Sequence, residues 1–131
     1  MYLLDTNICS ALMKGNRRAS IRFNRAFPQC YTSTIVVAEL YKGILDSQRL
    51  QDNLQSLADL TTYLAIESFD LAAAEEFGRI QVELKRIGKP TGEVDALIAA
   101  VARSRQSILV ANNTRHFENI ANLQLEDWLE P

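Results

Sequence analysis

The first seven residues place the strongest constraint on how this chain can fold. Tyr2, Leu3 and Leu4 form a short apolar run that ends abruptly in Asp5. An apolar run without polar alternation is typical of a strand buried on both faces, as in a parallel sheet. Asp5 then lies at the carboxyl end of that strand, the edge at which open α/β sheets bind ligands. The same aspartate could also cap the next helix, so its meaning depends on which other acids reach this edge.

Strand-like and helix-like segments alternate along the rest of the chain. Short apolar or β-branched runs predict further strands at residues 29–33, 64–66, 107–110 and 123–125. Apolar residues at helical spacing, together with cap and stop signals, predict helices at residues 8–14, 17–27, 35–45, 49–60, 71–87 and 93–105. This alternation predicts a three-layer α/β fold, with a short, mostly parallel sheet of about four to five strands flanked by helices on both faces.

The size and composition fit one domain with a buried core. The chain has 131 residues, of which 47% are apolar and 23% are charged, so we expect a single domain spanning residues 1–131. No apolar run is long enough to span a membrane. Cys9 and Cys30 lack metal-ligand spacing, and we expect them to be free thiols in a reducing cytoplasm. The net charge of −2 does not indicate a nucleic-acid-binding protein, so any such binding has to use local patches.

Two of the predicted helices carry a single acid within an apolar stretch. Glu39 lies within two turns of the start of residues 35–45, and Asp95 lies in the first turns of residues 93–105. A surface ion pair of Glu39 with Lys42, or an interaction of Asp95 with the helix dipole, would explain either acid without a function. However, a carboxylate on an apolar face is costly to bury unless it is capped, paired or bound to a metal. We therefore favour a functional role for both acids.

Asp5, Glu39 and Asp95 each follow a strand or begin a helix, so all three can reach one end of the sheet. Close carboxylates repel one another, and some take up protons unless a cation lies among them. Oxygen ligands suit Mg²⁺ or Mn²⁺, and such an ion promotes phosphodiester hydrolysis by activating water. The pattern therefore predicts a catalytic, metal-binding trio. Four neutral side chains are candidates for contacts around the ion, directly or through water: Thr6, Asn7, Asn112 and Asn113.

Basic side chains are grouped on one face of the second predicted helix. Arg18, Arg22 and Arg25 are spaced four and three residues apart, and Lys14 extends the series across Gly15. A solvated helix face would explain this stripe without a function, while a grip on phosphates or on an acidic partner would give it one. We include Lys14 and these three arginines among the candidate RNA or partner contacts, together with two residues of the late polar cluster, Arg115 and His116.

Four motifs in this order resemble the PIN-domain toxins of the VapC type. The motifs are Leu3-Leu4-Asp5-Thr6-Asn7, then Ala38-Glu39-Leu40 with Gly43, then Gly92-x-x-Asp95-x-x-Ile98-Ala99-Ala100, and then Leu109-Val110-x-Asn112-Asn113-Thr114-Arg115-x-Phe117. The segment from Leu123 to Trp128 is similar to the closing pattern of that family. The resemblance implies a PIN-like fold and a dimeric, Mg²⁺-dependent endoribonuclease that a partner antitoxin inhibits. It also implies that Asp5, Glu39 and Asp95 are the metal-binding acids.

The chain departs from this family pattern at three positions near the predicted site. Asn113 stands where many relatives have a fourth acid, which leaves one or two metal ions open. Ala111 stands where a hydroxyl residue is frequent, and His116 replaces a frequent Glu. These departures keep two alternatives open: a PIN-fold binding module without catalysis, and a PIN nuclease that acts on DNA or in RNA processing. A phosphorylated receiver domain is disfavoured, because the paired acids that such domains use after the first strand are absent.

Overall fold

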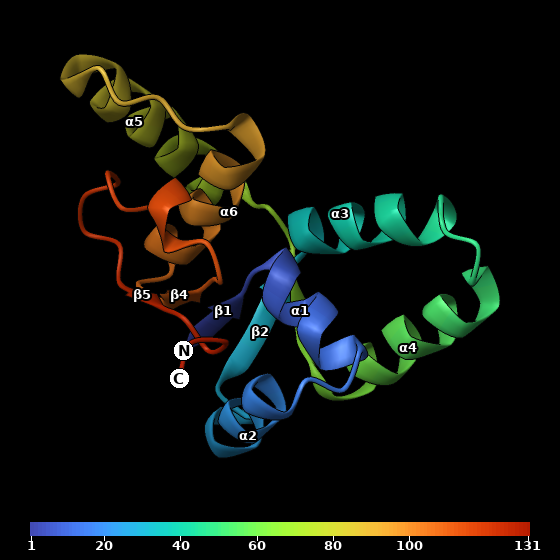
Figure 1. The fold of residues 1–131 in the computed structure, drawn as a ribbon. Coiled ribbons are helices and arrows are strands. Elements are labelled where there is room, and N and C mark those ends of the chain that lie inside the picture. Colours follow the sequence, from blue (N-terminus) through green and yellow to red (C-terminus); the bar gives the residue numbers. More distant parts are fainter.

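The strand β1 (Tyr2–Leu4) lies at the centre of a five-stranded sheet in which every pair of neighbours is parallel (Figure 1). The computed structural model describes all residues from 1 to 131. The other strands are β2 (Cys30–Ser33), β3 (Ala65–Glu67), β4 (Ile108–Val110) and β5 (Leu125–Glu126). Their spatial order is β3-β2-β1-β4-β5, and Tyr2 lies opposite Cys30 on one side and Ile108 on the other. The predicted parallel α/β sheet is therefore confirmed.

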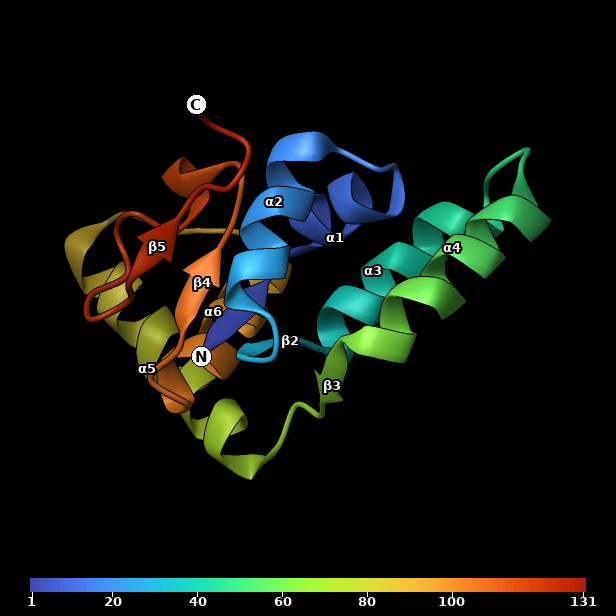
Figure 2. The same ribbon diagram turned by 90° about the horizontal axis from the view of Figure 1, so that it is seen from below.

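Helices cover both faces of this sheet. They are α1 (Thr6–Met13), α2 (Arg17–Ala26), α3 (Thr34–Leu45), α4 (Leu50–Tyr63), α5 (Leu71–Ile87) and α6 (Glu93–Ser104), with a short 3₁₀ turn, η1, at Thr114–His116. Figures 1 and 2 show α5 and α6 on one face and α1 and α2 on the other. The pair α3 and α4 forms a hairpin that extends beyond β2 and β3 (Figure 2). The segments after β1, β2 and β4 thus emerge at one edge of the sheet.

The long helix α5 shows how local signals set the bounds of an element. The side chain of Asp70 accepts a hydrogen bond of 2.9 Å from the Ala73 N–H at its start. Gly88 ends the helix with φ of 66°, a left-handed conformation that glycine adopts without steric cost. The predicted bounds of 71–87 agree with the structure, since both end signals lie next to the helix in the sequence.

Three elements differ from the prediction by two or more residues at one end, and the others agree to within one residue. The first helix begins at Thr6 rather than at residue 8, because Asp5 caps it. The fourth helix continues to Tyr63 rather than ending at residue 60, and the hydroxyl of Thr61 bonds back to carbonyls of the same helix. The last strand begins at Leu125 rather than at residue 123, since the positive φ of 58° at Asn122 places a turn just before it.

The apolar strands and the apolar faces of the helices form one core cluster of 26 buried residues. Leu3 and Leu4 in β1, and Ile98 and Ala99 in α6, are fully buried. Both cysteines are buried free thiols. None of the helices combines the length and the apolarity that a membrane crossing requires.

A buried arginine joins the two helices on one face of the sheet. Arg103 of α6 binds Glu76 and Glu83 of α5 at 2.5 and 2.7 Å, and it also donates to the carbonyl of Ala121 at 3.1 Å. Its side chain is only 9% exposed, so these bonds satisfy a guanidinium that has little access to water. This network fixes α6, and therefore the first turn that carries Asp95, against α5.

Candidate active site

Asp5 is the most buried of the three predicted acids. It follows β1 directly and caps α1, where its Oδ1 accepts a hydrogen bond of 2.7 Å from the Thr6 N–H. The residue is only 8% exposed. Burial raises the pKa of its carboxyl from the ordinary value of 3.8 to about 6, the Thr6 N–H opposes this rise, and Asp95 and Glu39 add to it. Asp5 is therefore both a cap and a carboxylate whose charge is opposed by its surroundings.

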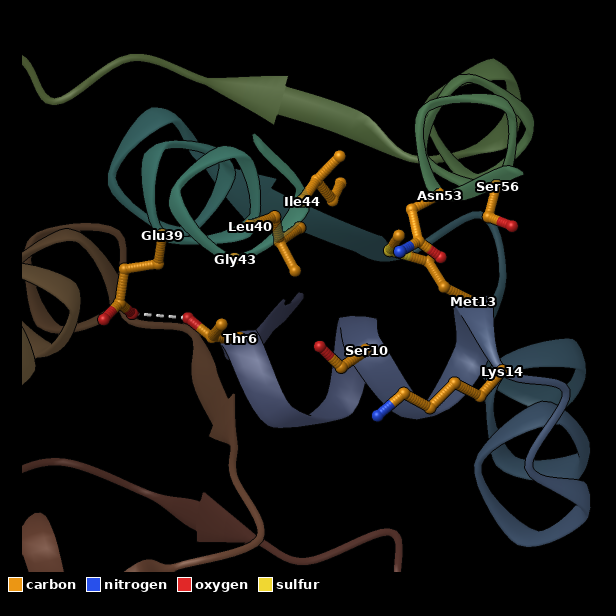
Figure 3. A pocket seen from close by; sticks show the side chains of 10 residues that line it. All are labelled: Thr6, Ser10, Met13, Lys14, Glu39, Leu40, Gly43, Ile44, Asn53 and Ser56. Carbon is orange, nitrogen blue, oxygen red and sulfur yellow. Dashed lines mark hydrogen bonds between the residues drawn. The ribbon is translucent and has the colours of Figure 1, made fainter. Parts of the chain in front are cut away.

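Glu39 reaches the same edge from α3. Its Oε1 accepts a hydrogen bond of 2.5 Å from the hydroxyl of Thr6, the residue that follows Asp5 (Figure 3). The surface ion pair with Lys42 that could have explained this acid is not formed. Glu39 is instead half-buried and directed toward the start of α1. Its hydrogen bond joins two segments that are 33 residues apart in the sequence.

Asp95 lies in the first turn of α6 and is half-buried. Burial raises the pKa of its carboxyl, His116 opposes that rise, and Glu39 adds to it. Its Oδ2 lies 3.2 Å from Nδ1 of His116. The charges of Asp95 and Glu39 both raise the pKa of Asp5, and the charge of Glu39 raises the pKa of Asp95. The three acids therefore interact electrostatically.

The three carboxylates do not form a finished ligand cage. No group of three or more His, Cys, Asp or Glu side chains is arranged to hold a metal ion. One oxygen of Asp5 accepts a hydrogen bond from the Thr6 N–H, one oxygen of Glu39 accepts a hydrogen bond from the Thr6 hydroxyl, and Oδ2 of Asp95 lies 3.2 Å from Nδ1 of His116. The second oxygen of each has no protein partner, and no buried side-chain oxygen is unsatisfied, so these second oxygens reach solvent. The donor set thus fits a hard cation in its chemistry, with one free carboxylate oxygen from each acid.

The four neutral candidates divide into two pairs. The hydroxyl of Thr6 donates a hydrogen bond directly to Glu39. The amide nitrogen of Asn113 lies 3.0 Å from Nε2 of His116, and the ring of His116 separates it from Asp95. Asn7 and Asn112 make no hydrogen bond to any of the acids. They are exposed and line a neighbouring groove on α1.

The basic candidates also divide. Arg22 pairs with Glu126 at 2.9 Å and lies over the ring of Trp128, while Arg18 donates to the carbonyl of Leu129 at 3.2 Å. These two arginines hold the C-terminal segment against α2, so two of the four basic residues of the series have a structural role. The remaining candidates Lys14, Arg25 and Arg115 are exposed and have no ion-pair partner. RNA or partner contact by these residues stays a prediction.

A cavity of about 370 Å³ opens beside Glu39, between α1, α3 and α4 (Figure 3). Thr6 and Glu39 lie at one end, and Asn53 and Ser56 of α4 lie at the other. The side chain of Lys14 runs back along α1 on the same wall. The sequence did not indicate this cavity, because it depends on how the hairpin of α3 and α4 packs against α1.

The sequence also did not indicate the contact between His116 and Asp95. These residues are 21 positions apart, and His116 comes from the turn η1 after β4. The only available signal was the parallel sheet itself, which brings the loop after β4 to the same edge as the residues after β1. RNA or partner contact by His116 stays a prediction, and its exposed ring lies close to one of the acids.

Comparisons with known proteins agree with this geometry. Residues 2–123 match the family model of the PIN domain. The chain is 40% identical over 129 residues to the "tRNA(fMet)-specific endonuclease VapC" of Shigella flexneri, covering 97% of both chains. Two solved structures align with a TM-score of 0.92: VapBC2 from Rickettsia felis bound to a promoter DNA fragment, at 32% identity and covering 97% of this chain and 98% of that one, and DNA-bound VapBC from Salmonella typhimurium, at 35% identity and covering 97% of both.

The family is therefore shown by the match of residues 2–123 to the PIN-domain model and by the 40% identity to a VapC ribonuclease over nearly the whole chain. PIN-domain VapC nucleases are generally metal-dependent, which agrees with the oxygen-only donor set of Asp5, Glu39 and Asp95. This protein belongs to the PIN-domain family, within the VapC-type ribonucleases.

Proposed function

We propose that residues 1–131 form a single PIN domain that cleaves RNA as the toxin of a type II toxin–antitoxin pair, with Mg²⁺ or Mn²⁺ as cofactor. The observation that carries the proposal is Asp5, a buried carboxylate whose charge is opposed by two further carboxylates at the same sheet edge. An arrangement of this kind is unfavourable for a protein alone and favourable around a divalent cation. Perturbed carboxylates in a concave site are candidates for catalysis.

Asp5, Glu39 and Asp95 would hold the cation through the oxygens that are free of protein partners. When bound, the cation would lower the pKa of a water molecule and neutralise charge on the phosphate. The protein residues orient the ligands: the Thr6 N–H and hydroxyl fix Asp5 and Glu39. The exposed cations Lys14, Arg25 and Arg115 would bind backbone phosphates on either side of the cleaved bond. Hydrolysis by the activated water would leave 5′-phosphate and 3′-hydroxyl ends.

The partners in this proposal follow from the relatives. The Rickettsia and Salmonella structures are VapBC complexes. We propose a VapB-like antitoxin as the partner of this chain and a homodimer as its assembly. A cytoplasmic location belongs to the same proposal, since RNA is the substrate and the two cysteines are free thiols.

Cleavage of total RNA by the purified protein, with Mg²⁺, with Mn²⁺ and with EDTA, tests the proposal. Asp5→Asn and Asp95→Asn are expected to lower the cleavage rate by at least about a hundredfold, as expected for loss of a ligand to a catalytic ion. The matched control is Asp70→Asn, which alters a helix-capping aspartate remote from the site and is expected to cleave as wild type does. Equal activity of wild type and Asp5→Asn, or full activity in EDTA, would contradict the proposal.

The same assay separates the two alternatives. Single-stranded DNA of matching sequence is expected to remain intact. Cleavage of this DNA at the same rate as RNA would favour the alternative of a PIN nuclease that acts on DNA. A binding module without catalysis would show no Mn²⁺ binding that depends on Asp95 in calorimetry, and no cleavage with either metal.

A further inference from the structure

A chain of two contacts leads from the polar loop after β4 to the acid Asp95. The amide nitrogen Nδ2 of Asn113 lies 3.0 Å from Nε2 of His116, and Nδ1 of the same ring lies 3.2 Å from Oδ2 of Asp95. The imidazole therefore has a partner at each nitrogen. It is an oriented group, although its side chain is 54% exposed.

The direction of these contacts follows from hydrogen-bonding capacity. An amide nitrogen can only donate, so Nε2 of His116 has to accept from Asn113. A neutral imidazole has one donor and one acceptor nitrogen, and its proton is therefore on Nδ1. The protonated Nδ1 then faces Oδ2 of Asp95 across a polar contact of 3.2 Å, and a carboxylate can only accept.

The backbone around His116 is held as well. Its carbonyl accepts a hydrogen bond of 2.8 Å from the hydroxyl of Thr91, which lies just before α6. The neighbouring Phe117 is 1% exposed and anchors the turn η1 in the core. The loop that carries His116 and the helix that carries Asp95 are thus joined at two points.

We propose that His116 is a positioning residue for Asp95, with Asn113 selecting the ring tautomer that donates to the carboxylate. This contact holds Oδ2 of Asp95 and leaves Oδ1 for a cation. For the role of Asp95 as a ligand, this inference rests on the proposed function. Donors that orient a ligating side chain typically contribute about ten- to a hundredfold to metal affinity. His116 is then part of the metal site through Asp95, without touching the ion.

Nitrogen NMR of the ring tests the tautomer directly. The chain contains one histidine, so its imidazole signals are unambiguous. In the metal-free protein at about pH 8, where an ordinary histidine is neutral, Nδ1 is expected to be protonated and Nε2 unprotonated. Asn113→Ala is expected to remove this preference. A wild-type ring protonated at Nε2, or a signal unchanged by Asn113→Ala, would overturn the role of Asn113.

Calorimetric titration with Mn²⁺ tests the positioning role without relying on activity. His116→Ala is expected to weaken Mn²⁺ binding by about tenfold, whereas His116→Asn, whose amide nitrogen can replace Nδ1, is expected to stay within about threefold of wild type. Equal weakening in both variants, as for a direct ligand, or no weakening in either, would overturn the proposal. Failure of the proposed function has a different signature: Asp95→Asn would then bind Mn²⁺ as tightly as wild type.

Discussion

Replacing Asp5 with Asn is expected to stabilise the metal-free protein at neutral pH, although it should abolish RNA cleavage. Burial, with smaller contributions from Asp95 and Glu39, raises the pKa of the Asp5 carboxyl from 3.8 to about 6. Since one pKa unit corresponds to about 1.4 kcal/mol, ionised Asp5 lowers the free energy of unfolding by about 3 kcal/mol. Asn has no charge to desolvate, and its side-chain oxygen can still accept the Thr6 N–H.

The sign of the effect follows from the order in which the two states lose the proton. Below the unfolded value of 3.8, both states are protonated at Asp5, so the variant and wild type should be equally stable. As the pH rises from 3.8 to about 6, the unfolded chain releases the proton first, and wild type loses stability relative to the variant. Above about 6 the difference reaches its full value of up to about 3 kcal/mol.

Urea unfolding of both proteins in EDTA across this pH range gives the measurement. The control is Asp70→Asn, because Asp70 also caps a helix with its carboxylate but is half exposed and lies near Arg105. This control should show no gain in stability at neutral pH. Addition of Mn²⁺ should stabilise wild type more than Asp5→Asn, since the cation offsets the charge only where a carboxylate is present. A variant that is less stable than wild type at neutral pH, or a gain independent of pH, would refute the reasoning.

Two further predictions concern the cationic side chains. Arg103→Met leaves two glutamates unpaired and is expected to lower the free energy of unfolding by about 2 kcal/mol. This loss is smaller than for a fully buried ion pair, because one of the glutamates reaches solvent. Urea unfolding measures the loss, and a value under about 0.5 kcal/mol would contradict the prediction. Arg22→Ala is expected to lower stability by about 1 kcal/mol and leave RNA binding unchanged, whereas Lys14→Ala should leave stability unchanged and weaken RNA binding with a shallower salt dependence. Unfolding curves and salt titrations of RNA affinity distinguish the two, and the reverse outcome would contradict the division of the basic residues.

The features that the sequence predicted are those encoded by neighbours along the chain. The bounds of α5 follow from Asp70 and Gly88, which lie directly beside the helix. The parallel sheet follows from apolar strands that alternate with helices. The three acids could be assigned to one edge because a parallel sheet brings the ends of its strands together, whichever side-chain contacts form there.

The features that the sequence could not give are contacts between distant segments. Arg22 and Glu126 are 104 residues apart, and no pattern along α2 indicates that an acid from the last strand will meet its basic face. The same holds for the bond from Thr6 to Glu39 and for the contact of His116 with Asp95. Residue spacing determines which face a side chain occupies, but the packing of whole helices and loops determines its partner.

Two aspartates of this chain, Asp70 and Asp5, both cap a helix, but their charges have different surroundings. Asp70 and Asp5 both have an extended backbone conformation, and the side chain of each accepts a hydrogen bond from a backbone N–H at a helix start. Asp70 is half exposed and lies 3.6 Å from Arg105, so its charge is solvated and countered. Asp5 is 8% exposed, has no cationic partner within ion-pair distance and is opposed by two other acids. A cap needs none of these unfavourable features, because Asn or Ser would serve equally well at that position. Capping therefore accounts for the orientation of Asp5 but not for its charge, and a bound cation accounts for both.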